Sequence, residues 1–184
     1  MQKIAKLGCE VTGLDPSQEY IKLAKKGKQT DASFGVAPLG KRQCLSQIPT
    51  SSVDVVFISD ALLFYFVSPT GPEPENISFL MEEIHRVLRP DGSFINIESH
   101  FQFWLSPWYG DEQHPFTILT EYSRRNFYVT PTSSEYIKTI VKFGFVLCWM
   151  DEPQPSPELT STSNRAFHFS MEFPLWQIFE FKKM

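Results

Sequence analysis

The sequence lacks several features that would place it in particular classes of protein. It has only three cysteines, Cys9, Cys44 and Cys148, whose odd number and spacing fit neither a disulfide framework nor a metal site. Its longest apolar runs, such as residues 61–67, are far shorter than the roughly 20 residues needed to cross a bilayer. The first eight residues also lack the apolar core of a signal peptide. We therefore expect a cytoplasmic protein with no metal and no membrane span.

Positive charge is also scarce. The 184 residues contain 17 Lys and Arg against 21 Asp and Glu, which gives a formal net charge of −4 and a pI near 5.6. Nucleic-acid binding through phosphate contacts needs a dense basic surface, and the sequence has no such stripe. With 42% hydrophobic residues the chain is typical of a globular protein. We expect a single domain over residues 1–184 and no nucleic-acid partner.

The first half of the chain alternates strand and helix patterns. A short apolar run, Glu10 to Leu14, precedes Asp15 and a helical pattern that ends at Gly27. Asp15 is a candidate N-cap for that helix. A weak strand and a loop follow between residues 31 and 49. Residues 53–59 (VDVVFIS) are almost continuously apolar, which predicts a parallel strand buried on both faces at the centre of a sheet.

The second half begins with the strongest helical stripe. Its apolar residues recur with helical spacing, at Ile77, Leu80, Met81, Ile84, Val87 and Leu88. A turn over Arg89 to Gly92 and a strand over Phe94 to Ile97 follow. Later patterns predict a helix over 134–143, a strand over 145–150, an exposed loop over 151–164 and a terminal strand over 175–181. This alternation predicts an α/β fold with a mostly parallel sheet.

These patterns specify a core. The inward positions of the strands and of the helical stripe are expected to be buried together: Val11, Val55, Val56, Phe57, Leu80, Ile84, Leu88 and Ile95.

An aromatic, irregular segment covers residues 101–131 and is too long for a simple connection. We interpret it as a lid or insertion that closes over the carboxyl edge of the sheet. Its aromatic residues, together with Tyr136, are candidates for lining an acceptor pocket or for core packing: Trp104, Trp108, Tyr109, His114, Tyr122 and Tyr128.

Five segments resemble consecutive parts of the class I S-adenosylmethionine-dependent methyltransferases. In order they read AKLGCEVTGLDPSQEYIKLAKK, SQIPTSSVDVVFISDALLFYF, FLMEEIHRVLRPDGSFINIES, EYIKTIVKFGFVLCWM and PLWQIFEFKK. They are similar to the end of the family's first helix and its second strand, its fourth strand, its fifth strand with the preceding helix, its last helix, and its final strands. The resemblance implies a Rossmann-like three-layer fold with an antiparallel terminal strand, and S-adenosylmethionine as the cofactor.

The resemblance also implies cofactor contacts. A carboxylate at the end of the second strand, here Asp15 before Pro16, would accept hydrogen bonds from the ribose hydroxyls. Ser59 and Asp60 would lie beside the methionine part, although Asp60 is equally a cap for the following helix. Where the family has an acidic residue for the adenine amino group, this chain has Arg42 and Gln43, and only Gln43 can accept a hydrogen bond.

No catalytic residue is assigned firmly, because methyl transfer depends mainly on alignment and the family has no universal base. Glu98 and His100 leave the strand over 94–97 at the edge where ligands bind. Either can face a substrate, and His100 can act as a base near neutral pH.

The family's first strand and Gly-rich turn have no counterpart before residue 3. The absent strand would lie between the strands that contain Val11 and Val55. Its absence leaves the backbone N–H and C=O groups along one edge of each strand without partners. Three alternatives are open: the two strands close on each other, another polypeptide supplies the strand, or the sequence is truncated. We expect methyl transfer to a small-molecule acceptor, impaired in this chain alone. The alternative is a non-catalytic binding or regulatory protein with this fold.

Overall fold

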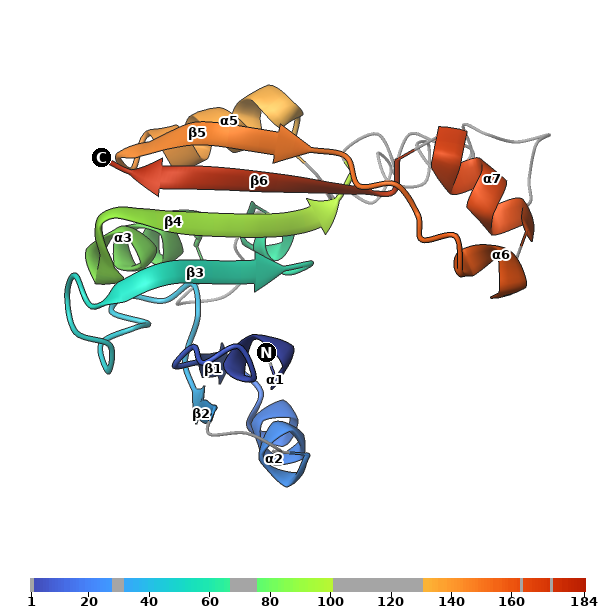
Figure 1. The fold of residues 1–184 in the computed structure, drawn as a ribbon. Helices are drawn as coiled ribbons and strands as arrows, with labels where there is room; N and C mark the ends of the chain where they lie inside the picture. The colour runs from blue at the N-terminus through green and yellow to red at the C-terminus, as the bar shows by residue number, and fades with distance from the viewer. Residues whose placement is uncertain (1, 28–31, 67–75, 101–130, 163, 173) are drawn as a thin grey trace, which may run out of the picture.

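The strands of the protein form two separate sheets (Figure 1). The structure is a computed structural model that describes residues 2–27, 32–66, 76–100, 131–162, 164–172 and 174–184. A two-stranded sheet has the order β1–β2, and a four-stranded sheet has the order β3–β4–β6–β5.

The small sheet is a complete parallel unit of strand, helix and strand. β1 (Thr12–Asp15) pairs with β2 (Ser33–Val36) in parallel, from Thr12 opposite Ser33 to Asp15 opposite Val36. Helix α2 (Gln18–Lys26) connects them, as a parallel pair requires. A short helix, α1 (Gln2–Ala5), precedes β1.

The large sheet is mixed. β3 runs parallel to β4, whereas β6 runs antiparallel to both β4 and β5. This confirms the expected α/β fold with an antiparallel terminal strand. The bounds are β3 Val53–Ser59, β4 Leu88–Ser99, β5 Phe145–Asp151 and β6 Trp176–Lys183. The helices along this part are η1 Leu62–Phe66, α3 Ile77–Val87 and α5 Ser133–Val141.

The core lies between the large sheet and two helices. Figure 1 shows α3 and α5 on the same face of the sheet, behind the strands. That face carries fully buried aromatic side chains from three strands, and α3 and α5 contribute the apolar residues that pack on them. The fully buried members include Phe94, Phe145, Phe179, Phe181, Leu80, Ile84, Leu88 and Ile140. Each buried side chain of this size contributes about 1.5–3 kcal/mol, so this layer supplies most of the stabilising burial.

The predicted core is confirmed in its helical part and wrong in part of β3. Leu80, Ile84 and Leu88 are buried, and Val11, Val56 and Ile95 are partly buried. Val55 and Phe57, however, are 51% and 49% exposed. They lie on the face of β3 opposite Val56 and Ile58, which pack against the core.

β3 is an edge strand, not the central strand that its apolar sequence predicted. Its one neighbour among the described strands is β4. β1, on the other side, belongs to the small sheet and does not pair with it. The sequence of β3 suits a strand covered on both faces, but the residues that the structure describes cover only one of them.

The segment 151–164, predicted as an exposed loop after β5, contains the short helix α6 (Leu159–Thr162), and α7 (Asn164–Glu172) begins at its last residue. The predicted lid over 101–131 lies outside the described residues except for Pro131, which is buried. Among the residues that the structure describes, no helix is both long and apolar enough to cross a bilayer. The same residues bring together no group of three or more His, Cys, Asp or Glu side chains that could hold a metal.

The predicted turn over Arg89 to Gly92 falls inside the bounds of β4, where it forms a bulge. Val53 pairs with Leu88, whereas Val55 pairs with Ser93, so the extra residues of β4 loop out of the ladder. A Cβ atom on Gly92 would lie 2.9 Å from the Arg89 carbonyl oxygen and 3.2 Å from that of Asp54. The close approach of β3 and β4 at the bulge therefore requires glycine at position 92.

Gly92→Ala should destabilise the protein by about 1–3 kcal/mol, because backbone atoms must move to admit the methyl group. The free energy of unfolding in urea measures this effect. Gly27→Ala is the matched control, since a Cβ atom there would lie 3.7 Å from its nearest neighbour, an ordinary contact. Equal stability of the two variants would contradict the prediction.

Candidate functional site

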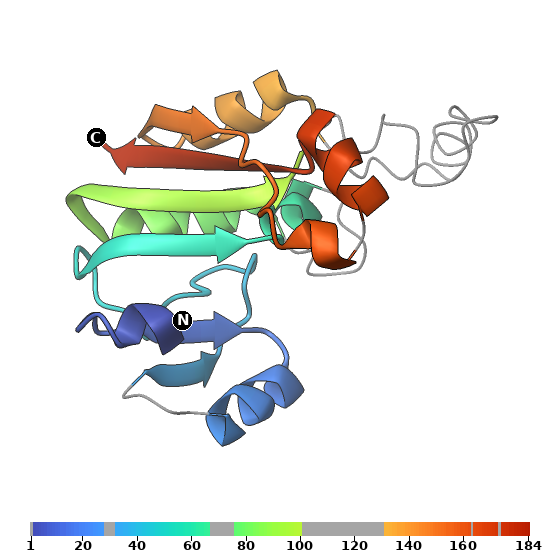
Figure 2. The same ribbon diagram turned by 45° about the vertical axis from the view of Figure 1, so that its right-hand side comes forward.

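The candidate residues gather at the carboxyl ends of the parallel strands. In Figure 2 the arrows of β1, β3 and β4 point to the same side of the molecule, where α6 and α7 also lie. Asp15 ends β1, Ser59 ends β3, and Ser99 ends β4. Open α/β sheets bind ligands outside this edge.

Asp15 is the last residue of β1 and precedes α2, and one of its two carboxylate oxygens has a hydrogen-bond partner among the described residues. Its Oδ1 atom accepts a hydrogen bond from the Ser17 backbone N–H at 2.7 Å. The N-cap of α2 is Ser17, whose side chain accepts from the Tyr20 N–H, so the expectation that Asp15 is the N-cap is wrong. Asp15 Oδ2 has no partner among the described residues, which leaves it able to accept a hydrogen bond from a ligand. Pro16 is exposed beside it.

Gln43 lies in the connection between β2 and β3. It is exposed, and its φ of 55° places it in the left-handed region. The neighbouring Arg42 is held by stacking, with its guanidinium carbon 4.5 Å from the centre of the Phe79 ring. Both residues are exposed, and of the two side chains only that of Gln43 can accept a hydrogen bond.

A partly buried ion pair on α3 fixes the same connection. Arg86 bonds Glu83 at 2.7 Å and donates to the carbonyl oxygens of Leu45 and Ile48 at 2.8 and 3.0 Å. Glu83 accepts from the Leu45 N–H at 2.9 Å. The hydrogen bond from Arg86 lowers the pKa of Glu83. Because several bonds converge on residues 45–48, the segment after Gln43 is tied to the core.

Asp60 connects β3 to the carboxyl end of β4. Its backbone N–H donates to the Ile97 carbonyl oxygen at 2.7 Å, and its Oδ1 atom accepts from the Ser99 hydroxyl at 3.1 Å. Its φ of 52° is unusual for a residue other than glycine. Strained backbone of this kind occurs where a loop must hold one conformation, often at a functional site. Ser59, the residue before it, is exposed.

Glu98 is buried and positions this loop, in contrast to the expectation that it faces a substrate. It is 1% exposed. Its Oε1 atom accepts from the backbone N–H groups of Ala61 and Leu62, at 3.3 and 2.7 Å, and from Asn96 Nδ2 at 3.0 Å. The Tyr136 hydroxyl in turn donates to Asn96 Oδ1. The carboxyl group thus anchors the two residues that follow Asp60.

Burial changes the acid–base properties of Glu98 and Tyr136. Desolvation raises the pKa of Glu98, and the nearby charge of Asp60 acts in the same direction. Desolvation also raises the pKa of Tyr136 well above its ordinary value. Tyr136 was a candidate for the acceptor pocket, but it is fully buried in the core and stacks on Phe66 at 5.2 Å. The other aromatic candidates, from Trp104 to Tyr128, lie outside the described residues.

His100 was a candidate to face a substrate, but it is only 5% exposed. Its Nε2 atom lies 2.8 Å from Glu152 Oε1, and its backbone N–H donates to the Leu175 carbonyl oxygen at 2.9 Å. These contacts join the ends of β4, β5 and β6. His100 is therefore a paired histidine at the edge where the substrate was expected.

The structure brings together one part of the predicted site. Four of the candidates lie at the carboxyl ends of β3 and β4: Ser59, Asp60, Glu98 and His100. Asp15 and Gln43 form no hydrogen bond with these four. Sequence reasoning missed Asn96, although its position two residues before Glu98 puts both on the same face of a strand. It also missed Glu152, because nothing in the local sequence connects it with His100.

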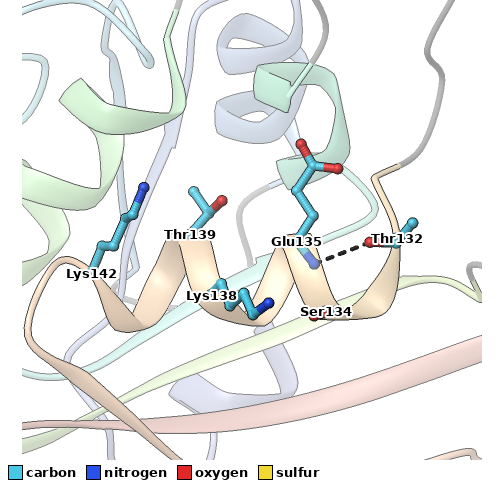
Figure 3. Close-up of a pocket in the computed structure, with 6 residues that line it drawn as sticks. All are labelled: Thr132, Ser134, Glu135, Lys138, Thr139 and Lys142. Carbon is cyan, nitrogen blue, oxygen red and sulfur yellow. Dashed lines mark hydrogen bonds between the residues drawn. The ribbon is translucent and has the colours of Figure 1, made fainter.

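A separate hollow lies on the outer face of α5 (Figure 3) and has a volume of about 380 Å³. Its lining is polar and consists of Thr132, Ser134, Glu135, Lys138, Thr139 and Lys142. The Thr132 hydroxyl accepts from the Glu135 N–H at 3.1 Å and caps the helix. None of the candidate site residues lines this hollow.

Glu98→Gln should make stability less dependent on pH. Because the pKa of Glu98 is raised, its contribution is fully present below its ordinary pKa of 4.5 and is lost as the pH rises through the folded value. Gln keeps an oxygen that can accept the N–H groups but cannot ionise. The free energy of unfolding of the Gln variant, relative to wild type, should therefore increase as the pH rises above the ordinary Glu pKa of 4.5.

Glu98→Leu is the contrasting variant. It removes the acceptor and leaves buried donors unsatisfied, at a cost of about 1–3 kcal/mol each. Parallel pH profiles for wild type and Glu98→Gln would contradict the assignment.

Several solved structures have a fold similar to that of this chain. An S-adenosylmethionine-dependent methyltransferase from Mesorhizobium loti is 18% identical, with a TM-score of 0.65 over 95% of this chain and 80% of its own. One from Methanosarcina mazei is 17% identical, with a TM-score of 0.64 over 99% and 85%. The [4+2]-cyclase SpnF is 14% identical, with a TM-score of 0.58 over 98% and 68%. At these identities the likeness concerns the fold.

The sequence comparison identifies the family. A comparison with curated proteins finds no match. Residues 1–96, slightly more than half of the chain, match the methyltransferase domain family. The parallel strands that end at Asp15 and Ser59, and the shared fold, agree with that match. The chain therefore belongs to the class I, Rossmann-like family of methyltransferases that use S-adenosylmethionine.

Proposed function

We propose that this protein transfers a methyl group from S-adenosylmethionine to a small molecule bound at the carboxyl edge of its sheets. The observation that carries the proposal is the placement of Asp15 and of the Ser59–Asp60 loop at the ends of parallel strands on one side of the molecule (Figure 2). Family membership supports methyl transfer in general.

The donor set at this edge fits the cofactor. Asp15 Oδ2 has no described partner and can accept from a ribose hydroxyl. Gln43 is exposed and can accept from an adenine amino group, whereas Arg42 can only donate. Ser59 and Asp60, beside the expected methionine part, offer a hydroxyl and a carboxylate, and Pro16 adds an apolar surface next to Asp15.

Bound S-adenosylmethionine supplies an electrophilic methyl group on a sulfonium. Asp15, Gln43 and the Ser59–Asp60 loop would hold the cofactor, which would supply its methyl group for direct displacement from sulfur by the acceptor. The protein contributes mainly alignment. In this role Glu98 is a positioning residue, because its bonds to Ala61 and Leu62 hold the loop that carries Asp60. Where the acceptor must lose a proton, His100 with Glu152 is the paired base at this edge.

The acidic character of the chain supports a small acceptor. A net charge of −4 disfavours the close approach of nucleic-acid phosphates. The two lysines that line the hollow, Lys138 and Lys142, lie on the outer face of α5 and not at the carboxyl edge.

The second candidate function is a binding or regulatory role without methyl transfer. The separation of the two sheets favours it, because Asp15 and the Ser59–Asp60 loop belong to different sheets that no strand pairing holds in register. The same fold occurs in a protein named as a [4+2]-cyclase, so it is compatible with other chemistry.

The 184-residue chain should bind S-adenosylmethionine with a Kd no tighter than about 1 mM. Each charged hydrogen bond contributes about 1.5–3 kcal/mol, and micromolar binding needs about 8 kcal/mol. Titration calorimetry measures the Kd, and micromolar binding by this chain would contradict the prediction. Saturation-transfer NMR detects the weak complex, and Asp15→Asn should weaken the signal by about tenfold or more.

Asp54→Asn is the matched control for Asp15→Asn. Asp54 is a carboxylate near the start of β3, on the opposite edge, where it pairs with Arg89 on the surface. Its substitution should leave the NMR signal unchanged. Equal loss in both variants, or no signal in wild type at millimolar cofactor, would favour the non-catalytic alternative.

A further inference from the structure

We propose that the carboxyl end of β4 and the start of β6 form a binding site for the alkylammonium group of a small amine. Asp60 pairs with the positive charge, and Trp176 packs against the alkyl substituents. The inference rests on the proposed function only in naming this amine as the methyl acceptor. Binding itself needs no cofactor and can be measured separately.

The carboxylate of Asp60 is the first part of the site. Its Oδ1 atom accepts a hydrogen bond from the Ser99 hydroxyl at 3.1 Å, so the side chain extends along the edge of the sheet towards β4. Among the described residues no lysine or arginine forms an ion pair with it. A carboxylate without a cationic partner favours a ligand that brings a positive charge and N–H donors.

The indole ring of Trp176 is the second part. Trp176 is the first residue of β6 and lies directly opposite Ser99 in the antiparallel ladder with β4. The side chains of such a pair lie on the same face of the sheet, with their Cβ atoms about 4.5–5.5 Å apart. Trp176 is 39% exposed, so part of its surface is open to a ligand. Among side chains, tryptophan attracts cations to its ring face most strongly.

Ser99 lies between these two parts. The Asp60 carboxylate reaches it from the side of β3, and Trp176 lies on its other side, where β6 begins beside the arrowhead of β4 (Figure 1). Neighbouring strands are about 4.8 Å apart, which places the backbones of Asp60 and Trp176 about 10 Å from each other. Across the short side chain of Ser99, the carboxylate and the indole can therefore contact the same ammonium group.

Hydrogen bonds hold both parts in place before a ligand binds. The loop that carries the carboxylate is anchored to β4 by its backbone N–H groups. The residues on either side of Trp176 are tied to β4 as well. The Leu175 carbonyl oxygen accepts from the His100 N–H at 2.9 Å, and Gln177 Nε2 donates to the Ser99 carbonyl oxygen at 3.3 Å. A site that is already ordered loses less entropy when it binds.

A second tryptophan and carboxylate on the same face provide an internal contrast. Trp149 of β5 is 48% exposed and lies opposite Glu180 of β6. The Glu180 carboxylate, however, accepts from the Ser93 hydroxyl at 2.8 Å and lies 3.4 Å from Lys182 Nζ. Because a lysine already compensates the charge of Glu180, this second pair should not attract a further cation.

The experiment titrates the chain with choline, a soluble alkylammonium probe, and follows the indole N–H signals by NMR without cofactor. Choline should shift the Trp176 signal and leave the Trp149 signal in place. The Kd is taken from the backbone amide signal of Ser99 in every form of the protein. Choline should bind at least about threefold more tightly than dimethylbutanol, its uncharged carbon analogue. Trp176→Leu and Asp60→Asn should each weaken choline binding by about two- to fivefold.

Trp149→Leu is the matched control and should leave choline affinity unchanged. Trp176→Phe keeps an aromatic face and should retain more affinity than Trp176→Leu, which separates the loss of the ring from a loss of structure. Equal affinity for choline and dimethylbutanol, or equal losses in Trp149→Leu and Trp176→Leu, would overturn the proposal.

Two further outcomes test the nature of the ligand. Tighter binding of acetyl-lysine amide than of choline would assign the site to a protein side chain and overturn the small amine as its ligand. Choline binding in a chain that methylates no amine would support the binding site and overturn only its role for the acceptor.

Discussion

Strand β4 sets the constraint on which the rest of the structure depends. It hydrogen-bonds β3 in parallel on one side and β6 in antiparallel fashion on the other, so it alone fixes how the two kinds of pairing meet. One face of β4 carries Phe94, Asn96 and Glu98 into the core. The same strand therefore sets the sheet register, the centre of the hydrophobic layer and the position of the loop at Asp60.

Two buried glutamates of the protein behave in opposite ways because their partners differ. Glu83 faces a guanidinium, whose hydrogen bond lowers the pKa of Glu83 and keeps it ionised. Glu98 accepts hydrogen bonds from neutral N–H groups and lies near the charge of Asp60, so desolvation, the largest effect, raises its pKa. Both hold loops that lead towards the proposed cofactor site. Glu83 therefore stabilises its loop at pH values above the ordinary Glu pKa of 4.5. Glu98 holds the other loop, but the burial of its charged form is unfavourable.

The sequence predicted the helices and strands better than it predicted which residues pack next to them. The stripe of α3 was readable because a period of 3.6 residues recurs over three turns, and Leu80, Ile84 and Leu88 are buried as expected. The apolar run of β3 predicted a strand, but its place at an edge depends on which strand lies next to it. The sequence placed Glu98 and His100 correctly at the carboxyl end of β4. Their burial was not predictable, because Ala61, Leu62 and Glu152, which pair with them, are distant in sequence.

The strand order β3–β4–β6–β5 also affects how the sheet assembles. β5 precedes β6 in the chain, yet it reaches β4 only through β6. During synthesis β5 therefore leaves the ribosome without a neighbour to pair with, and it must wait for β6. In that interval the apolar side chains of β5, including Phe145 and Leu147, have no sheet on which to pack. The nascent chain thus passes through a stage in which these residues are available to chaperones or to other chains.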